Sequence, residues 1–437
     1  MNICRIDCFL PCHSIDSIVP MASAMSRSVA VGNIYLLMAE PPVDTSAASG
    51  CDILQASNIA SSDTLRLIAS KARATYVLLS TKAQPVKIGY KALERMVKVA
   101  DETSAALLYS DRMTENEGTM SKHPTIDYQL GAVRDDFDFG QILLIRTSLL
   151  KKYVASAVQT AYSFAAIYDL RLFLSRQGKV VHLNECLYTE QEMDTRESGE
   201  KQFDYVNPRN RDVQIEMEQA ATAHIAALGA SVNTMTYGRM DFNEQQFDVE
   251  ATVVIPVFNR AKTIADAVNS ALSQTTTFPY NVIVVDNHST DGTTEIISRL
   301  ANYDSRVVHI IPERNDLGIG GCWNMAIQDS RCGRFAIQLD SDDLYSREST
   351  LQRVVDKFYE EHCAMVIGSY RMCDFNLRTL PPGVIDHKEW TDENGRNNAL
   401  RINGLGAPRA FYTPLLRQIG VPNTSYGEDY ALGLAFS

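Results

Sequence analysis

Three carboxylates crowd into one short segment of the sequence. Asp340, Asp342 and Asp343 follow one another closely, with only Ser341 among them. Like charges at this spacing repel unless a cation compensates them, and Mg²⁺ and Mn²⁺ prefer carboxylate and phosphate oxygens as ligands. The segment could therefore hold a divalent cation together with the phosphates of a nucleoside diphosphate. It could also be an exposed acidic turn in which Asp343 caps the helix that follows.

The surrounding sequence indicates how such a turn would be positioned. Runs rich in Val, Ile and Phe at 251–260, 280–292, 307–313 and 334–340 are typical of strands, and the stretches between them repeat apolar residues at helical spacing. Alternating strands and helices predict an α/β fold with a mostly parallel sheet covered by helices. Ligands of such sheets bind at the carboxyl ends of the strands, which is where the acidic turn lies.

Five short motifs of the second half occur in the order in which the family-2 glycosyltransferases carry them. They are Pro256-Val257-Phe258-Asn259, Val285-Asp286-Asn287-His288-Ser289-Thr290-Asp291-Gly292, Asn315-Asp316-Leu317-Gly318 followed by Asn324, Asp340-Ser341-Asp342-Asp343, and Glu428-Asp429. One motif alone is weak, but the ordered set is specific, and over about residues 250–437 the chain resembles this enzyme family. The resemblance implies the nucleotide-sugar fold called GT-A.

The resemblance also implies a role for individual residues. Asp286 would accept a hydrogen bond from uracil or a similar base, and Phe258 would lie beside the base or ribose. Asp340 would bind the ribose, Asp342 would ligate Mg²⁺ or Mn²⁺, and Asp429 would be the general base. Further contacts to the donor nucleotide are expected from Pro256, Asn259, Asn315, Asn324 and Ser341.

These roles predict an inverting, metal-dependent glycosyltransferase. It would move a sugar from a nucleotide-diphospho-sugar, with a UDP-sugar as the first expectation, to a hydroxyl of a glycan or another acceptor in surface polysaccharide or glycan biosynthesis. The alternative is a non-catalytic protein that keeps the fold for binding or scaffolding. A nucleotidyltransferase would need an N-terminal glycine-rich loop, and a dinucleotide-binding dehydrogenase would need G-x-G-x-x-G, which Trp323 interrupts.

The first half of the sequence repeats the pattern without its carboxylates. Residues 74–79 align with 333–338, which suggests an internal duplication. Where the second half has its acidic turn, the first half reads Ser80-Thr81-Lys82-Ala83-Gln84-Pro85, and Ile167 stands where the second half has Asp429. A divalent cation would find no carboxylate there.

Two domains and a linker are therefore expected. Residues 1–230 would form a degenerate GT-A-like domain without catalytic activity, 231–249 a polar linker, and 250–437 the catalytic domain. The second half stops at Ser437, before the counterpart of the helix end and strand into which the first half continues. We therefore also expect the catalytic domain to be truncated at its C-terminus.

Composition narrows the choice of partners. The 437 residues carry 41 Lys and Arg against 53 Asp and Glu, a net charge of −12, without a dense basic run, which argues against nucleic acid. No apolar stretch approaches the length of a membrane-spanning helix, and the first residues do not follow the pattern of an export signal. We expect a cytoplasmic protein that could form homo-oligomers.

The cysteines offer one competing site. Nine are scattered along the chain, which fits reduced thiols better than a disulfide framework. Cys4, Cys8 and Cys12, followed by His13, could supply soft ligands to zinc or an iron–sulfur cluster. Their spacing is not the two-residue separation of paired zinc ligands, so buried or unused thiols are the simpler interpretation.

Overall fold

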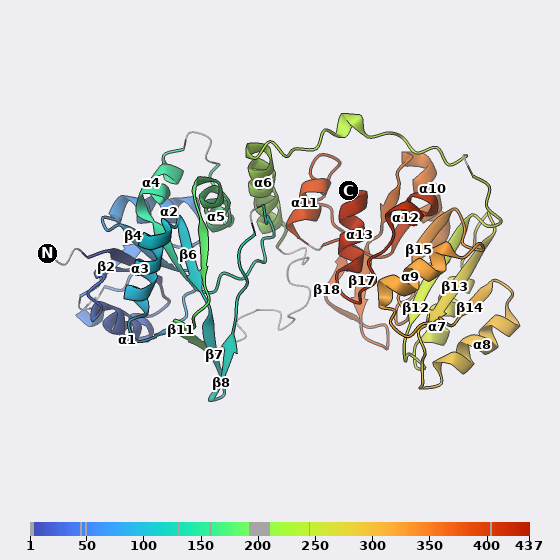
Figure 1. The fold of residues 1–437 in the computed structure, drawn as a ribbon, viewed down its shortest axis with the longest axis horizontal. Helices are drawn as coiled ribbons and strands as arrows, with labels where there is room; N and C mark the ends of the chain where they lie inside the picture. The colour runs from blue at the N-terminus through green and yellow to red at the C-terminus, as the bar shows by residue number, and fades with distance from the viewer. Residues whose placement is uncertain are drawn as a thin grey trace. The chain divides into compact units, whose positions relative to one another are not determined.

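Two compact units make up the part of the chain that the computed structural model describes. The first includes Asn210–Ser231 and the second runs over Val232–Ser437. Each unit contains a mixed sheet with helices on both faces (Figure 1). The described residues are 4–43, 46–48, 50–129, 131–156, 160–191, 210–243, 245–402 and 404–437.

The second unit is built on a sheet with the strand order β14-β13-β12-β15-β19-β16 within the described residues. Neighbouring strands from β14 to β15 are parallel, whereas β19 runs antiparallel to β15 and β16. The strands are β12 (Ala251–Val257), β13 (Tyr280–Asp286), β14 (Val307–Ile310), β15 (Phe335–Gln338), β16 (Met365–Ile367) and β19 (Arg409–Tyr412).

Helices bury this sheet from both sides, which is why its strands read as continuous Val and Ile runs rather than alternations. One face packs against α7 (Ile264–Leu272), α8 (Thr293–Tyr303) and α10 (Thr350–Glu361). The other packs against α9 (Ile319–Gln328), α12 (Thr413–Ile419) and α13 (Glu428–Phe436). The remaining elements of the unit are η4 (Thr234–Thr236), the hairpin of β17 (Tyr370–Cys373) with β18 (Thr379–Ile385), and α11 (Gly395–Arg401).

The first unit has a sheet of order β10-β6-β9-β4-β1-β2-β3 and a smaller sheet β5-β11-β7-β8, again among the described residues. Its strands are β1 (Ile6–Pro11), β2 (Val31–Met38), β3 (Asp52–Gln55), β4 (Tyr76–Ser80), β5 (Lys87–Ile88), β6 (Leu107–Ser110), β7 (Arg112–Asn116), β8 (Thr119–His123), β9 (Ile142–Arg146), β10 (Val180–Leu183) and β11 (Tyr188–Gln191). Its helices are α1 (Ile15–Ser26), η1 (Ser46–Ala48), α2 (Ser62–Lys71), α3 (Ala92–Thr103), α4 (Thr147–Val154), α5 (Ala166–Gln177) and α6 (Arg211–Ala227).

The two large sheets share one topology. The order β6-β9-β4-β1-β2-β3 corresponds strand for strand to β16-β19-β15-β12-β13-β14. The pairing is also the same in detail, because Tyr76 of β4 lies opposite Arg146 of β9 as Phe335 of β15 lies opposite Tyr412 of β19. This register equals that of the alignment of residues 74–79 with 333–338. The structure thus confirms the α/β fold with two similar sheets that we predict from the sequence.

The segment predicted as a linker contributes to the core of the second unit. Phe242 is 3% exposed, and its ring lies 5.1 Å from that of Phe335 in an edge-to-face arrangement. It also contacts the rings of Phe358 and Tyr412. The aromatic residues of this mostly polar stretch, Tyr237, Phe242 and Phe247, recur at neither helical nor strand spacing, so the sequence pattern did not reveal this anchor.

The cysteine cluster does not form a site in the described residues. Cys8 and Cys12 are buried, and all nine cysteines are unpaired. Burial raises the pKa of the Cys12 thiol to about 11, and no three His, Cys, Asp or Glu side chains of the described chain converge as metal ligands. The simpler interpretation of buried thiols fits this placement.

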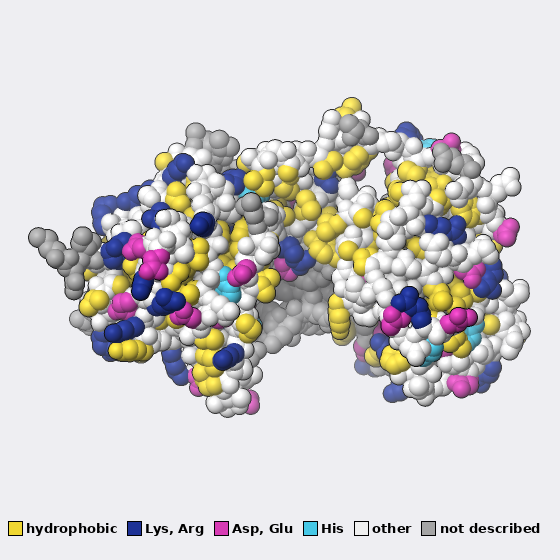
Figure 2. Space-filling view, viewed as in Figure 1, with side chains coloured by type: hydrophobic (Ala, Val, Ile, Leu, Met, Phe, Trp, Pro, Cys, Tyr) yellow, Lys and Arg dark blue, Asp and Glu magenta, His cyan; other side chains and the backbone are white. Residues whose placement is uncertain are grey.

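The surface carries charges of both signs. On the face drawn in Figure 2, Lys and Arg side chains are interspersed with Asp and Glu side chains over both units. Among the described helices, none has the length and apolar character that crossing a membrane requires.

We expect the buried side chain of His224 to make the stability of the first unit depend on pH. The side chain lies on α6, is 2% exposed, and its Nε2 has no hydrogen-bond partner in the described residues. Burial, with smaller contributions from Arg176 and Arg171, lowers the pKa of His224 from 6.5 to about 4. The unfolded chain therefore takes up a proton at a higher pH than the folded chain, so stability falls between pH 6.5 and about 4.

We expect the free energy of unfolding of the first unit to drop by about 1–2 kcal/mol from pH 7.5 to pH 5 on this account. Denaturant titrations at both pH values measure it. His224→Gln removes the titrating group and should show a smaller drop. An equal drop in the variant would mean that other groups control the pH dependence.

Candidate active site

A cavity of about 500 Å³ opens at the carboxyl ends of β12 and β15 in the second unit. It brings together residues from Pro256 to Leu432, which are 432 − 256 = 176 positions apart in the sequence. The predicted site residues on its wall are Pro256, Phe258, Asp340, Ser341, Asp342 and Asp429. Side chains on the wall that the motifs did not single out for a role include Arg260, Trp323, Gln338, Arg409, Ser425 and Glu428.

The acidic turn follows β15 directly and faces this cavity. The backbone N–H of Asp343 donates to the carbonyl of Asp340 over 3.1 Å and closes the turn. The Nε of Arg260 lies 3.5 Å from Oδ2 of Asp342 and partly compensates its charge. Helix α10 begins at Thr350 with Ser349 as its N-cap residue, so Asp343 does not cap that helix.

Mutual repulsion and desolvation both act on these carboxyls. Asp340 is open to the cavity but surrounded by protein on its other sides, and this desolvation raises its pKa, with smaller contributions from Asp342 and Asp429. Desolvation, followed by the charges of Asp340 and Asp342, raises the pKa of Asp343 to about 6. The turn therefore holds more negative charge than its surroundings readily accommodate.

Asp429 reaches the same cavity from the first turn of α13. The preceding Gly427, with φ of 78°, reverses the chain so that the helix starts at the cavity wall. Oδ1 of Asp429 accepts from the backbone N–H of Tyr430 at 2.7 Å, and Oδ2 lies 3.0 Å from Nη2 of Arg409. Both oxygens of the predicted base are thus fixed by a donor.

A short relay of side chains connects Asp429 with the acidic turn. Nη1 of Arg409 donates to Oε1 of Gln338 at 3.1 Å, and Nε2 of Gln338 donates to Oδ1 of Asp340 at 2.9 Å. Gln338 and Arg409 are neighbours because each lies next to the last pair of the antiparallel strands β15 and β19, Ile337 and Ala410. No sequence motif marks either residue, since their contact comes from strand pairing.

Three predicted donor-binding residues lie outside the cavity wall and make contacts within the protein. Asp286 is 0% exposed and accepts from the backbone N–H of Ser289 at 3.0 Å and from the hydroxyl of Thr294. Asn259 accepts at 2.8 Å from the backbone N–H of Thr290. Nδ2 of Asn324 donates to the carbonyl of Val421, and Oδ1 of Asn324 accepts from the backbone N–H of Val421 at 2.9 Å. Their nucleotide roles remain predictions.

Asn315, the last predicted residue, lines a smaller neighbouring hollow. This hollow of about 410 Å³ shares Phe258 and Asn287 with the larger cavity and also touches His288. Phe258 is 54% exposed, so one face of its ring is available to a flat ligand. The two hollows together could hold a base, a ribose and a diphosphate.

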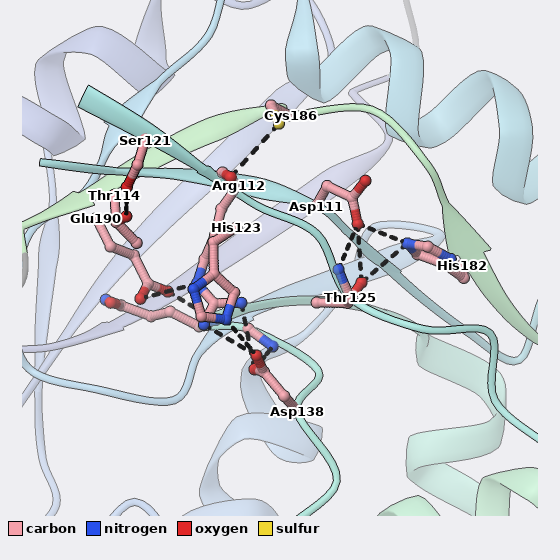
Figure 3. Close-up of polar contacts among 12 residues, drawn as sticks. Asp111, Arg112, Thr114, Ser121, His123, Thr125, Asp138, His182, Cys186 and Glu190 are labelled. Carbon is pink, nitrogen blue, oxygen red and sulfur yellow. Dashed lines mark hydrogen bonds and ion pairs between the residues drawn. The ribbon is translucent and has the colours of Figure 1, made fainter. Parts of the chain in front are cut away.

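The first unit has a network of ion pairs among its own side chains beyond the carboxyl end of β4. Lys82, in the loop after β4, lies 3.6 Å from Oε2 of Glu190. Nε of Arg112 lies 3.1 Å from the same oxygen (Figure 3). Nη2 of Arg112 also lies 3.0 Å from Oδ2 of Asp138. Gln141 closes the group by donating to the hydroxyl of Ser80 at 2.9 Å. The small sheet thus supplies partners where the second unit leaves carboxylates facing a cavity.

The donor atoms of the second unit's cavity are suited to a hard cation. Asp340 and Asp342 offer carboxylate oxygens, which Mg²⁺ and Mn²⁺ prefer. No cluster of three protein ligands is present among the described residues. Mg²⁺ is commonly held by one or two carboxylates and by phosphates of the substrate, so the arrangement fits a cation that binds together with a diphosphate.

Comparison with known proteins bears on the same segment. Residues 252–412 match the family model described as "Glycosyl transferase family 2". This match confirms the resemblance to the family-2 glycosyltransferases that the motifs predict.

Curated relatives are similar to part of the chain. The putative teichuronic acid biosynthesis glycosyltransferase TuaG of Bacillus subtilis is 30% identical over 121 residues, 28% of this chain and 46% of that protein. The poly(ribitol-phosphate) beta-N-acetylglucosaminyltransferase TarS of Staphylococcus aureus is 30% identical over 169 residues, 38% of this chain and 28% of that protein. The chain thus spans less than half the length of either relative.

A crystal structure of S. aureus TarS 1-349 superposes with a TM-score of 0.35 at 27% identity, covering 43% of this chain and 55% of that one.

The close packing around Gly320 supports the wall of the cavity. A Cβ at this position in α9 would overlap the carbonyl oxygen of Pro422, in the segment that leads to the wall residue Ser425. We expect Gly320→Ala to destabilise the second unit by about 1–3 kcal/mol in denaturant unfolding, because the backbone must move to make room.

Gly395→Ala is the matched control, since a Cβ there meets no atom within 4 Å. Equal stability of Gly320→Ala and wild type would contradict the close packing of α9 on this wall.

Proposed function

We propose that the second unit transfers a sugar from a nucleoside diphosphate sugar to a hydroxyl acceptor with inversion at the anomeric carbon. The observation that carries this proposal is the meeting of Asp340, Asp342 and Asp429 around one cavity at the carboxyl edge of the sheet, inside the unit that matches the family model. A cavity of about 500 Å³ has the size of a small-molecule site.

The proposed reaction follows from where the carboxylates stand. Asp429 accepts the proton of the acceptor hydroxyl while that oxygen forms a bond to the anomeric carbon. The bond from this carbon to the diphosphate breaks on the opposite face, and the nucleoside diphosphate leaves. Arg260 lies beside Asp342 and can contact the phosphates. A divalent cation bound at Asp342 with the diphosphate would neutralise the charge of the leaving group.

The donor and product classes are part of the proposal. TarS and a relative from Bacillus spizizenii, 31% identical over 171 residues, are named for adding N-acetylglucosamine and glucose to poly(ribitol-phosphate), and an ExoO relative of Rhizobium meliloti for succinoglycan biosynthesis. These names support a hexose or N-acetylhexosamine as the transferred sugar and a role in building a cell-surface polymer. A UDP-sugar is the donor that we propose to test first. Nucleotide release from UDP-, GDP- and dTDP-sugars with Mn²⁺ or Mg²⁺ tests this directly, and no release from any donor would contradict it.

The first unit is proposed to be non-catalytic. Its ion pairs among Lys82, Glu190, Arg112 and Asp138 occupy the place that corresponds to the cavity. Opening this network would cost several contacts before a nucleotide could enter.

Asp342→Ala should abolish turnover that depends on Mn²⁺ and leave the free energy of unfolding almost unchanged. The carboxylate is exposed and has like-charged neighbours, so its removal relieves repulsion rather than packing. Initial rates across a Mn²⁺ titration measure the effect. Turnover within about tenfold of wild type would show that Asp342 is not the metal ligand.

Asp429→Asn should lower kcat by about 10²- to 10⁴-fold while the affinity for UDP stays within about threefold of wild type. The amide cannot accept the proton, but it keeps the shape of the side chain. Calorimetry with UDP and Mn²⁺ gives the affinity. A loss of affinity as large as the loss of kcat would assign Asp429 to the nucleotide site instead.

A further inference from the structure

Arg409 is the residue of the cavity whose position the proposed chemistry does not yet explain. Its side chain is 14% exposed, and it comes from the first residue of the short strand β19. Its guanidinium is held by three acceptors: Oε1 of Gln338 at 3.1 Å, the carbonyl of Leu405 at 3.1 Å and Oδ2 of Asp429 at 3.0 Å. An arginine fork with this many partners has a fixed orientation.

The carboxylates around Arg409 make a positive charge favourable at this position. Asp340, Asp342, Glu428 and Asp429 all line the same cavity. Burial raises the pKa of Glu428, Asp429 raises it further, and Arg409 acts in the opposite direction. Arg409 also lowers the pKa of Asp340 against the effect of desolvation. A guanidinium does not lose its proton in a protein, so Arg409 is a permanent positive charge among these carboxylates.

The first unit supplies an independent comparison. The shared strand register puts Leu143 of β9 where β19 has Arg409. Leu143 is 5% exposed and its strand pairs normally, so an arginine is not needed to form this strand. Helix α5 has Ile167 at its second position, where α13 has Asp429. The arginine and the carboxylate are thus absent together from the unit that has no acidic turn.

We propose that Arg409 is the positioning residue of the transfer reaction: its guanidinium fixes Oδ2 of Asp429 and keeps this carboxylate aimed at the acceptor hydroxyl. This inference rests on the proposed function. It assigns Arg409 to the general base and not to the donor, because the guanidinium contacts Asp429, Gln338 and the Leu405 carbonyl. Arg409 holds Oδ2, and Oδ1, which accepts one hydrogen bond from the Tyr430 N–H, keeps a second lone pair for the incoming proton.

The test compares kinetic constants of the full chain with a donor that wild type turns over in the nucleotide-release screen. Arg409→Gln should lower kcat about 100-fold with KM for the donor and Kd for UDP within about threefold. Arg409→Lys should recover part of the rate, since it restores the charge without the fork. Millimolar guanidinium should raise the rate of Arg409→Ala, which a merely structural role would not allow.

Two further variants complete the design. Arg409→Gln combined with Asp429→Asn should be no slower than Asp429→Asn alone, because the arginine acts through the carboxylate. Arg331→Gln is the matched control: Arg331 forms an ion pair with Asp329 at 2.6 Å and does not line the cavity, and kcat should stay unchanged.

The other possible results separate failure of the role of Arg409 from failure of the proposed function. A kcat of Arg409→Gln within threefold of wild type, or a UDP affinity that falls as much as kcat, overturns the positioning role while the proposed function stands. Failure of wild type to release nucleotide from any donor overturns the proposed function, and the role of Arg409 falls with it.

Discussion

Negative charge gathered at one edge of a sheet is the constraint around which the second unit is organised. Asp340, Asp342, Glu428 and Asp429 share one cavity, and repulsion and desolvation raise the pKa of Asp340 and Glu428 there. Such an arrangement is unfavourable unless cations or hydrogen-bond donors offset it. Arg260 and Arg409 offset part of it within the protein. A divalent cation that binds together with a nucleoside diphosphate would offset more of this negative charge.

The first unit shows what the same fold becomes without this constraint. Strand order and register are those of the second sheet, yet Lys82, Arg112 and Glu190 pair with one another where the cavity would be. His182 also lies 2.8 Å from Asp111 (Figure 3). It lies 2.7 Å from Asp127 on its other side, so polar groups of this unit are again satisfied by one another. The two units therefore share a topology but not the acidic site residues, since the fold needs its apolar strands and not its carboxylates.

The sequence could predict whatever depends on local pattern. Val and Ile runs gave the strands of the second sheet, and Asp340, Asp342 and Asp429 were recognisable from short motifs. Gln338 and Arg409 were not, because they meet only when β15 and β19 pair. Phe242 was missed because the aromatic residues of its polar segment follow neither helical nor strand periodicity. Asp286 was identified as a base-binding residue, and the structure adds its contacts to Ser289 and Thr294 inside the protein.

We expect the acidic cavity of the second unit, and not the matching place in the first, to bind a nucleoside diphosphate with a divalent cation. Titration calorimetry of the full chain with UDP, in the presence and absence of Mn²⁺, counts the binding sites. One site per chain that needs Mn²⁺ is expected. Two equivalent sites, or binding of equal strength without the metal, would show that the acidic cavity is not the metal-dependent nucleotide site.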